Sequence, residues 1–226
     1  MMGRPEEALT LAIPRGRPTP EVVALLGRAG LDASSVLSNG RGLVSTSRDG
    51  AVRFLMAKPF DVPAYVEAGA ADLGVAGKDV LMELEPAVVE LADLGVGRCR
   101  MVVAGPRDGP DDVAAYPSPL RVATRYPRVA ARFFRNLGLA VHVVALHGSI
   151  ELAPQVGLAD VIVDLVQTGR TLQANALKEL VEIAPISARL VANPVRWRVR
   201  HEAIMALLLR LEACLRDDAR AAAAPL

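Results

Sequence analysis

Short apolar runs alternate with amphipathic stretches along most of the chain, and this alternation limits the fold more than any single motif does. Apolar runs bounded by turn residues are typical of buried strands, and the longer amphipathic stretches between them are typical of covering helices. Such an order predicts an α/β protein with a mostly parallel sheet. We expect strands at residues 9–13, 72–76, 100–105, 121–123, 141–146 and 161–164.

Helix signals frame both ends of the chain. Thr19 is expected to be the N-cap of a helix with Pro20 at its first position and Gly30 as its stop. Near the other end, Asn193 and a following proline predict the start of one last helix over residues 195–216.

One internal similarity suggests two related lobes. The segments EAGAADLGVAGKD and QVGLADVIVDLVQTGRT both contain Gly-x-Ala-Asp, an apolar strand and a glycine turn with a basic residue. Their aspartates are Asp72 and Asp160. Chance similarity between two helix-to-strand junctions is the alternative. If the lobes are real, we expect a ligand in the cleft between them.

The composition excludes several classes of protein. The formal net charge of +1 gives no overall attraction to nucleic acid or membrane. Cys99 and Cys214 lie far apart without a CxxC pattern, so neither a disulfide framework nor a zinc site is expected. The longest stretch without Asp, Glu, Lys or Arg, residues 136–150, is too short and polar to cross a bilayer. With no signal peptide expected either, the expected location is the cytoplasm.

The segment DLVQTGRT, residues 164–171, has the composition of a sugar-phosphate site. A Thr-Gly-x-Thr turn after a parallel strand directs backbone N–H groups and hydroxyls toward one point, which suits a phosphate. Asp164, at the strand end, can accept hydrogen bonds from neighbouring sugar hydroxyls. The alternative is that Asp164 and Thr171 only cap the next helix while Gly169 permits the turn.

Longer segments resemble one family. These are LAIPRGR, RFLMAKPFDVPAYVEAGAADLGVAGKDVL, DLGVGRCRMVVAGP, RVATRYP and GSIELAPQVGLADVIVDLVQTGRTLQANAL. Together they resemble the short form of ATP phosphoribosyltransferase, which opens histidine biosynthesis. The resemblance implies two periplasmic-binding-protein-like lobes with a ligand cleft between them. We expect lobe I to comprise residues 1–105 and 183–226, and lobe II residues 106–182.

The resemblance also implies a reaction and its residues. ATP and phosphoribosyl pyrophosphate would give N1-(5-phosphoribosyl)-ATP and pyrophosphate, with Mg²⁺ whose protein ligands stay unassigned. By the same match, the phosphoribosyl loop comprises Asp164, Thr168, Gly169, Arg170 and Thr171, with Glu151 nearby. Glu151 is open to three roles, namely contact to ribose, contact to magnesium, or general base. The residues implied at the adenine nucleotide are Arg17, Lys58, Asp72, Leu73 and Gly74.

Local charge fits two polyanionic substrates. Residues 14–58 contain seven basic and three acidic side chains. Negative charge develops on the departing pyrophosphate, so catalysis needs cations near that group. Arg53 and Arg15 are the catalytic candidates. At Arg15 the family usually has lysine, so a planar guanidinium replaces a point charge.

Three alternatives remain beside this interpretation. Asp72 can cap the next helix in a turn at the sheet edge. Trp197, among three arginines, can stack on RNA, although a helix start or a subunit contact is favoured and no nucleic-acid partner is expected. The whole chain can also be a binding module without catalysis, or an orotate- or purine-type phosphoribosyltransferase.

Partners follow from the resemblance as well. The short form of the family acts with a regulatory subunit similar to histidyl-tRNA synthetase. We therefore expect a homodimer in isolation, insensitive to histidine, and a hetero-oligomer with that partner.

Overall fold

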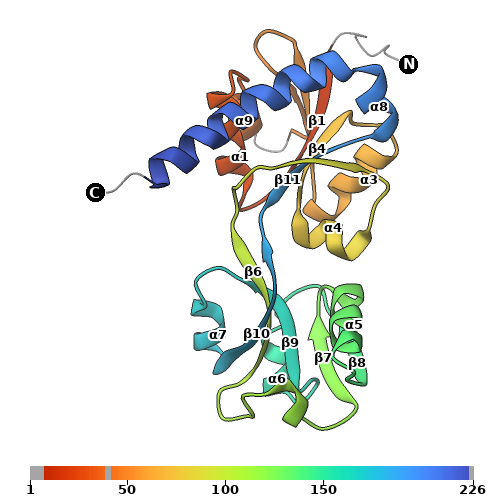
Figure 1. Cartoon of the computed structure of the whole chain (residues 1–226), viewed down its shortest axis with the longest axis vertical. Coiled ribbons are helices and arrows are strands. Elements are labelled where there is room, and N and C mark those ends of the chain that lie inside the picture. The colour runs from red at the N-terminus through yellow and green to blue at the C-terminus, as the bar shows by residue number, and fades with distance from the viewer. Residues whose placement is uncertain (1–7, 39–41, 224–226) are drawn as a thin grey trace. The chain divides into compact units, whose positions relative to one another are not determined.

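The computed structural model describes residues 8–38 and 42–223. The chain divides into two α/β units (Figure 1), Met1–Gly97 with Ser187–Leu226, and Arg98–Ile186. As predicted, the first unit is discontinuous in sequence. The expected boundaries between the lobes, after residues 105 and 182, differ from the observed ones, which follow Gly97 and Ile186. Strands β6 and β10 pair with each other along their full lengths and therefore belong to one sheet.

The first unit contains the sheet with strand order β2, β3, β1, β4, β11, β5, which we call the first sheet. Strands β3, β1 and β4 are parallel, while β2, β11 and β5 pair antiparallel with their neighbours. The parallel strands therefore end at one edge, called here the carboxyl edge. The strands are β1 Leu9–Pro14, β2 Val44–Thr46, β3 Val52–Ala57, β4 Leu73–Gly77, β5 Val89–Asp93 and β11 Ala188–Ala192.

Strand β1 is buried along its whole length because helices cover both faces of the first sheet. Leu11 and Ile13 belong to the core beside α1 and α9, whereas Ala12 belongs to the core beside α3. The helices are α1 Thr19–Arg28, α2 Ser34–Ser38, η1 Pro59–Asp61, α3 Val62–Glu67, α4 Lys78–Leu84, α8 Pro194–Val199 and α9 His201–Ala223.

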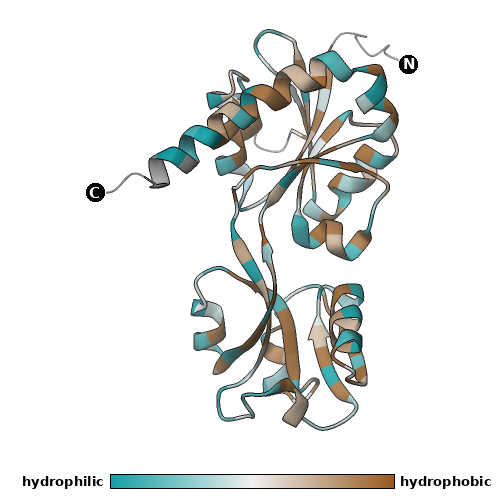
Figure 2. Ribbon diagram, viewed as in Figure 1, coloured by the Kyte–Doolittle hydropathy of each residue, from teal (hydrophilic) through white to brown (hydrophobic). Residues whose placement is uncertain are grey.

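The second unit contains the sheet with strand order β10, β6, β9, β7, β8, called here the second sheet. Strands β9, β7 and β8 are parallel, and β6 is antiparallel to both of its neighbours. Hydrophobic residues colour much of the central β9 (Figure 2). The strands are β6 Cys99–Pro106, β7 Leu120–Thr124, β8 Val141–Ala145, β9 Val161–Val166 and β10 Leu177–Ile186; the helices are η2 Val113–Ala115, α5 Pro127–Asn136, α6 Leu152–Gln155 and α7 Arg170–Ala174.

The first helix differs from the prediction at its start. Thr19 is already helical and Pro18 precedes it without a side-chain cap. The Thr19 hydroxyl instead accepts a hydrogen bond from the Gly16 N–H at 3.0 Å and donates one to the Pro14 carbonyl at 2.7 Å. Thr19 thus stabilises the turn between β1 and α1. The predicted stop is confirmed, since Gly30 has the left-handed φ of 78° that follows a helix end.

The expected last helix is two helices, α8 and α9, with Arg200 between them. Asn193 caps α8 as predicted, because its side-chain oxygen accepts the N–H groups of Val195 and Arg196, each at 2.9 Å. Trp197 packs against the core of the first unit, which favours the helix-start interpretation over RNA stacking. Within the described part of the chain, none of the helices combines the length and the apolar character needed to cross a membrane.

Candidate functional site

The predicted strand, turn and helix at residues 164–171 are confirmed. Strand β9 ends at Val166, and Gly169 precedes α7 with a left-handed φ of 75°. A residue with a Cβ atom would be strained there. The side chains of Thr168, Arg170 and Thr171 are exposed at this turn. The turn therefore presents its donors at the carboxyl edge of the second sheet.

The capping alternative does not describe this turn. The N-cap of α7 is Gly169, no side chain caps it, and Thr171 lies inside the helix. The Asp164 carboxylate accepts a hydrogen bond from the N–H of Leu165 at 2.8 Å. Only the role of Gly169 in permitting the turn agrees with that alternative. The N–H groups at the start of α7 are thus not occupied by a side-chain cap.

Asp164 lies among charged groups from other elements of the second unit. Burial is the main cause that raises the pKa of its carboxyl group, and the nearby Glu151 carboxylate raises that pKa further. The N–H of Leu165 and the Arg125 guanidinium lower it. One carboxylate and one guanidinium from other elements therefore act on the Asp164 carboxyl group. Sequence reasoning missed Arg125, whose signal is its place directly after the strand in RVATRYP.

A hollow of about 280 Å³ adjoins the turn within the second unit. Two of the charges at its wall have partners. Lys178 donates to the Gly109 carbonyl at 2.7 Å and to Asp111 at 2.5 Å. Glu179 binds Arg100 through two hydrogen bonds of 2.7 and 3.0 Å. The hollow is lined by Arg107, Thr168, Gly169, Leu172, Gln173, Leu177, Lys178 and Glu179.

In the first unit the structure brings Arg15 and Lys58 together. Pro14 and Ala57 are neighbours in the parallel pair β1 and β3, and the Arg15 N–H donates to the Ala57 carbonyl at 2.8 Å. Arg15 and Lys58 are therefore the first residues after two adjacent strands, and both are exposed. Arg17 follows in the same turn and is also exposed. These three cations gather at the carboxyl edge of the first sheet.

Arg53 lies elsewhere in the first unit. It is the second residue of β3, half-buried, and in register with Thr10 near the start of β1. At about 3.3 Å per residue, four residue steps along a strand separate Arg53 from Ala57 by roughly 13 Å. The unit therefore does not bring Arg53 to Arg15, and its catalytic role stays a prediction.

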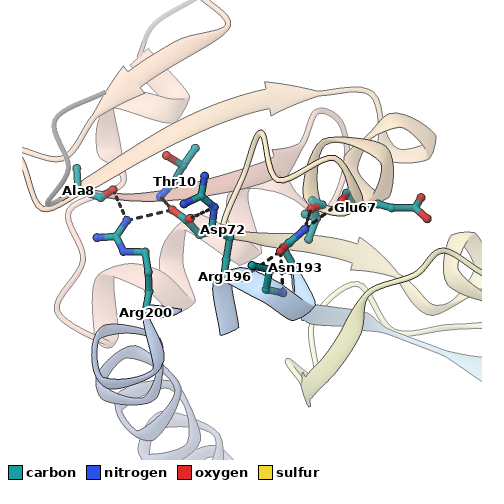
Figure 3. Close-up of polar contacts among 9 residues, drawn as sticks. Ala8, Thr10, Glu67, Asp72, Asn193, Arg196 and Arg200 are labelled. Carbon is teal, nitrogen blue, oxygen red and sulfur yellow. Dashed lines mark hydrogen bonds and ion pairs between the residues drawn. The ribbon is translucent and has the colours of Figure 1, made fainter. Parts of the chain in front are cut away.

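Asp72 lies at the start of the strand expected at residues 72–76 and not in a turn after it. It directly precedes β4 at the edge opposite Arg15, and only 3% of its surface is exposed. The Asp72 carboxylate accepts the Thr10 N–H at 2.8 Å and the Arg200 guanidinium at 3.3 Å, and it forms an ion pair of 3.5 Å with Arg196 (Figure 3). Asp72 thus holds α8 and α9 to the first sheet. It does not cap the next helix, whose N-cap is Gly77.

Leu73 and Gly74 are also explained by packing. Leu73 is fully buried. A Cβ atom on Gly74 would lie 2.6 Å from a methyl carbon of Val66, so glycine permits α3 to approach β4. That Asp72, Leu73 and Gly74 border ATP stays a prediction, because this geometry gives each of them a structural role.

No group of three or more His, Cys, Asp or Glu side chains that could hold a metal ion occurs among residues 8–38 and 42–223. Asp164 and Glu151 are two nearby carboxylates. In enzymes that bind phosphorylated substrates, Mg²⁺ is usually held by one or two carboxylates together with the substrate phosphates. The residues present therefore fit a magnesium ion that arrives with a phosphorylated substrate.

Two α/β units joined by two crossings of the chain define a two-lobed fold. A periplasmic sulfonate-binding protein SsuA from Methylobacillus flagellatus shares this fold, with a TM-score of 0.64 and 12% identity, covering 92% of this chain and 68% of that chain. The ATP phosphoribosyl transferase (HisG:HisZ) complex from Thermotoga maritima matches with a TM-score of 0.77 and 35% identity, covering 92% and 99%.

Sequence comparison identifies the family. The family model HisG: ATP phosphoribosyltransferase matches residues 58–213. The ATP phosphoribosyltransferase of Sorangium cellulosum is 46% identical over 205 residues, which are 91% of this chain and 95% of that protein. That of Rubrobacter xylanophilus is 48% identical over 203 residues, with coverages of 88% and 93%. The chain belongs to the ATP phosphoribosyltransferase family, as its sequence predicted.

Proposed function

We propose that the chain transfers the phosphoribosyl group of phosphoribosyl pyrophosphate to N1 of ATP and releases pyrophosphate. This is the first step of histidine biosynthesis. The observation that carries the proposal is the turn after β9, where the family's segment from Asp164 to Thr171 forms a strand end, a left-handed glycine and a helix start. A two-lobed fold alone would suggest only ligand binding.

The turn suits the sugar phosphate of the donor substrate. The N–H groups at the start of α7, the hydroxyls of Thr168 and Thr171, and Arg170 are donors for the 5-phosphate. Asp164 accepts hydrogen bonds from the ribose hydroxyls. Burial that raises the pKa of Asp164 also strengthens its hydrogen bonds, since fewer water molecules compete for its oxygens.

The cations of the first unit suit the nucleotide and the leaving group. Arg15, Arg17 and Lys58 gather at one sheet edge and can bind the triphosphate of ATP. Arg15, at this edge, is the candidate to stabilise the negative charge that develops on pyrophosphate, whereas Arg53, near the other end of β3, keeps that role only as a prediction from the sequence. Adenine N1 already carries a lone pair, so the reaction does not depend on Glu151 as a general base. Contact to ribose or magnesium is the role proposed for Glu151.

Magnesium is the proposed cofactor. When bound, it neutralises phosphate charge on the substrates and thereby assists departure of pyrophosphate. Asp164 and Glu151 are the protein carboxylates that would hold it beside the turn.

The test combines the purified chain with ATP, phosphoribosyl pyrophosphate and Mg²⁺, and measures pyrophosphate and N1-(5-phosphoribosyl)-ATP. Replacing Arg170 and Thr171 together by Ala removes charge-assisted hydrogen bonds of about 1.5 to 3 kcal/mol each, so calorimetry should show phosphoribosyl pyrophosphate binding at least about tenfold weaker. The matched control is Arg135→Ala, an exposed arginine in the last turn of α5.

Each competing function has its own result. Binding of both substrates without release of pyrophosphate would identify a binding module. Turnover with orotate or a free purine base in place of ATP would identify another phosphoribosyltransferase. Unchanged affinity in the double variant would remove the turn from the phosphoribosyl site.

We also propose that the chain works with a separate regulatory subunit. The matching Thermotoga maritima structure is a HisG:HisZ complex. We expect a homodimer for the isolated chain and a larger hetero-oligomer with the partner, with histidine inhibition only in the latter. Light scattering and a histidine titration with and without the partner test this. Inhibition of the isolated chain by histidine would place the regulatory site within these 226 residues.

A further inference from the structure

Arg125 stands at the carboxyl edge of the second sheet, immediately after β7. In the parallel pair β7 and β9, Ala123 is in register with Ile162 and Thr124 with Val163. Continuing this register by one residue places Arg125 level with Asp164. Arg125 therefore leaves the sheet beside the residue proposed to bind the ribose.

The backbone on both sides of Arg125 is held by buried neighbours. Thr124 is fully buried, and its hydroxyl donates to the Val163 carbonyl at 2.7 Å and accepts from the Tyr126 N–H at 2.9 Å. The Thr124 carbonyl accepts the Leu146 N–H at 2.9 Å. Tyr126 is only 3% exposed, whereas the Arg125 side chain is exposed. The fold thus presents one exposed guanidinium from a fixed backbone.

The order of the candidate binding groups across the second sheet matches the order of chemical groups along phosphoribosyl pyrophosphate. The turn at residues 168–171 leads into α7, which lines the hollow with residues of β10. Figure 1 shows α7 on the β10 side of the second sheet and α5 on the β7 and β8 side. Across the sheet the groups therefore come in the order turn, Asp164, Arg125. The substrate carries its 5-phosphate, ring hydroxyls and pyrophosphate in the same order.

The distances involved suit this correspondence. Neighbouring strands lie about 4.8 Å apart. The side chain of an arginine one strand away from Asp164 can therefore reach a group bonded to the ribose that Asp164 binds. Arg125 already lowers the pKa of the Asp164 carboxyl group, so its charge acts at this place. A planar guanidinium can bind two oxygens of one phosphate group.

We propose that Arg125 is a substrate-binding residue that contacts the pyrophosphate of phosphoribosyl pyrophosphate. The inference rests on the proposed function, because it takes the 5-phosphate to lie at the turn that follows β9.

The experiment separates the two ends of the substrate. Calorimetry with Mg²⁺ measures three ligands on the full chain: phosphoribosyl pyrophosphate, pyrophosphate and ribose 5-phosphate. For Arg125→Ala we expect about tenfold weaker binding of both ligands that contain pyrophosphate, because one charge-assisted contact is lost. Ribose 5-phosphate should bind within about twofold of the parent chain, because its phosphate lies at the turn.

Two further variants complete the design. Arg125→Lys keeps the charge and should recover part of the lost pyrophosphate affinity. Arg135→Ala removes an exposed arginine at the far end of α5 and should change none of the three affinities. Denaturant unfolding of each variant shows whether the fold is preserved.

The outcomes are distinct for the two proposals. If the affinities for all three ligands fall equally, Arg125 only holds Asp164 or the backbone. If the affinity for pyrophosphate is unchanged, Arg125 does not belong to the site. Either result overturns the inference. If the parent chain binds neither ribose 5-phosphate nor phosphoribosyl pyrophosphate, the proposed function itself fails. If the Arg170 and Thr171 double variant selectively loses ribose 5-phosphate binding, the proposed function is supported. That result does not depend on the role of Arg125.

Discussion

Asp72 in the first unit and Asp160 in the second occupy the same place in their sheets, directly before a parallel strand. Asp72 donates its N–H to the Thr10 carbonyl at 2.9 Å and accepts the Thr10 N–H on its carboxylate at 2.8 Å. Asp160 makes the same pair of hydrogen bonds with Arg121, at 2.8 and 2.9 Å. The repeated Gly-x-Ala-Asp pattern is therefore a structural motif and not a chance similarity.

The other residues of the motif have matching roles. Gly69 and Gly157 end the preceding helices with left-handed φ angles of 67° and 70°. Ala71 and Ala159, at 0% and 3% exposure, are buried in the cores. In both units the chain leaves a helix at glycine, buries an alanine and joins the neighbouring strand through the aspartate.

The two aspartates differ in their arginine partners. Asp72 binds Arg196 and Arg200, which come from the last part of the chain. Asp160 binds the side chain of Arg121 itself, which is 46% exposed. The same local motif thus also fastens α8 and α9 in the first unit only. Both aspartates lie at the amino edge of their sheets, away from the turn that carries Asp164.

The largest effect on stability is expected for Asp72→Ala. The change leaves the buried Thr10 N–H and the largely buried Arg200 guanidinium without their carboxylate partner. This loss should lower the free energy of unfolding by about 3 kcal/mol. Denaturant unfolding measures this. An exposed control is Asp217→Ala on α9. A loss no larger than that of the control would show that α8 and α9 do not depend on Asp72.

Asp160→Ala should cost less, about 1 kcal/mol, because its arginine partner is half exposed to solvent. Hydrogen bonds from Arg121 lower the pKa of Asp160 in the folded protein. Its contribution is therefore present above the ordinary aspartate pKa of about 3.9 and is lost as the pH falls below that value. Unfolding experiments from pH 7 down to acid should show the parent and variant converging; a constant difference would contradict the assigned cause.

Asp164→Asn should have the smallest effect on stability and a large effect on turnover. Burial raises the Asp164 pKa, so ionisation of this group disfavours the folded state at neutral pH. The variant should be as stable as the parent at pH 7 or slightly more so, and the difference should shrink as the pH falls through the raised pKa. Product formation should fall at least about tenfold through lost ribose hydrogen bonds. Full activity would exclude Asp164 from the site.

Local patterns allowed much of the fold and one part of the site to be predicted. The run at β1 lies between turn residues, the left-handed Gly30 follows α1, and Asn193 caps α8 with its own side chain. The turn at residues 164–171 is likewise contained in eight consecutive residues. Each of these features depends on interactions between residues that are close in sequence, so the sequence by itself determined them.

Tertiary contacts decided the rest. Asp72 and Arg200 are 128 positions apart, and only the docking of α9 on the first sheet makes them partners. Arg125 lies level with Asp164 because β7 and β9 pair in one register, and Arg53 is separated from Arg15 because it lies near the other end of β3. Charged side chains show no periodicity that reveals their partners. Strand order and register, set by burial of apolar faces, determine which charges lie together.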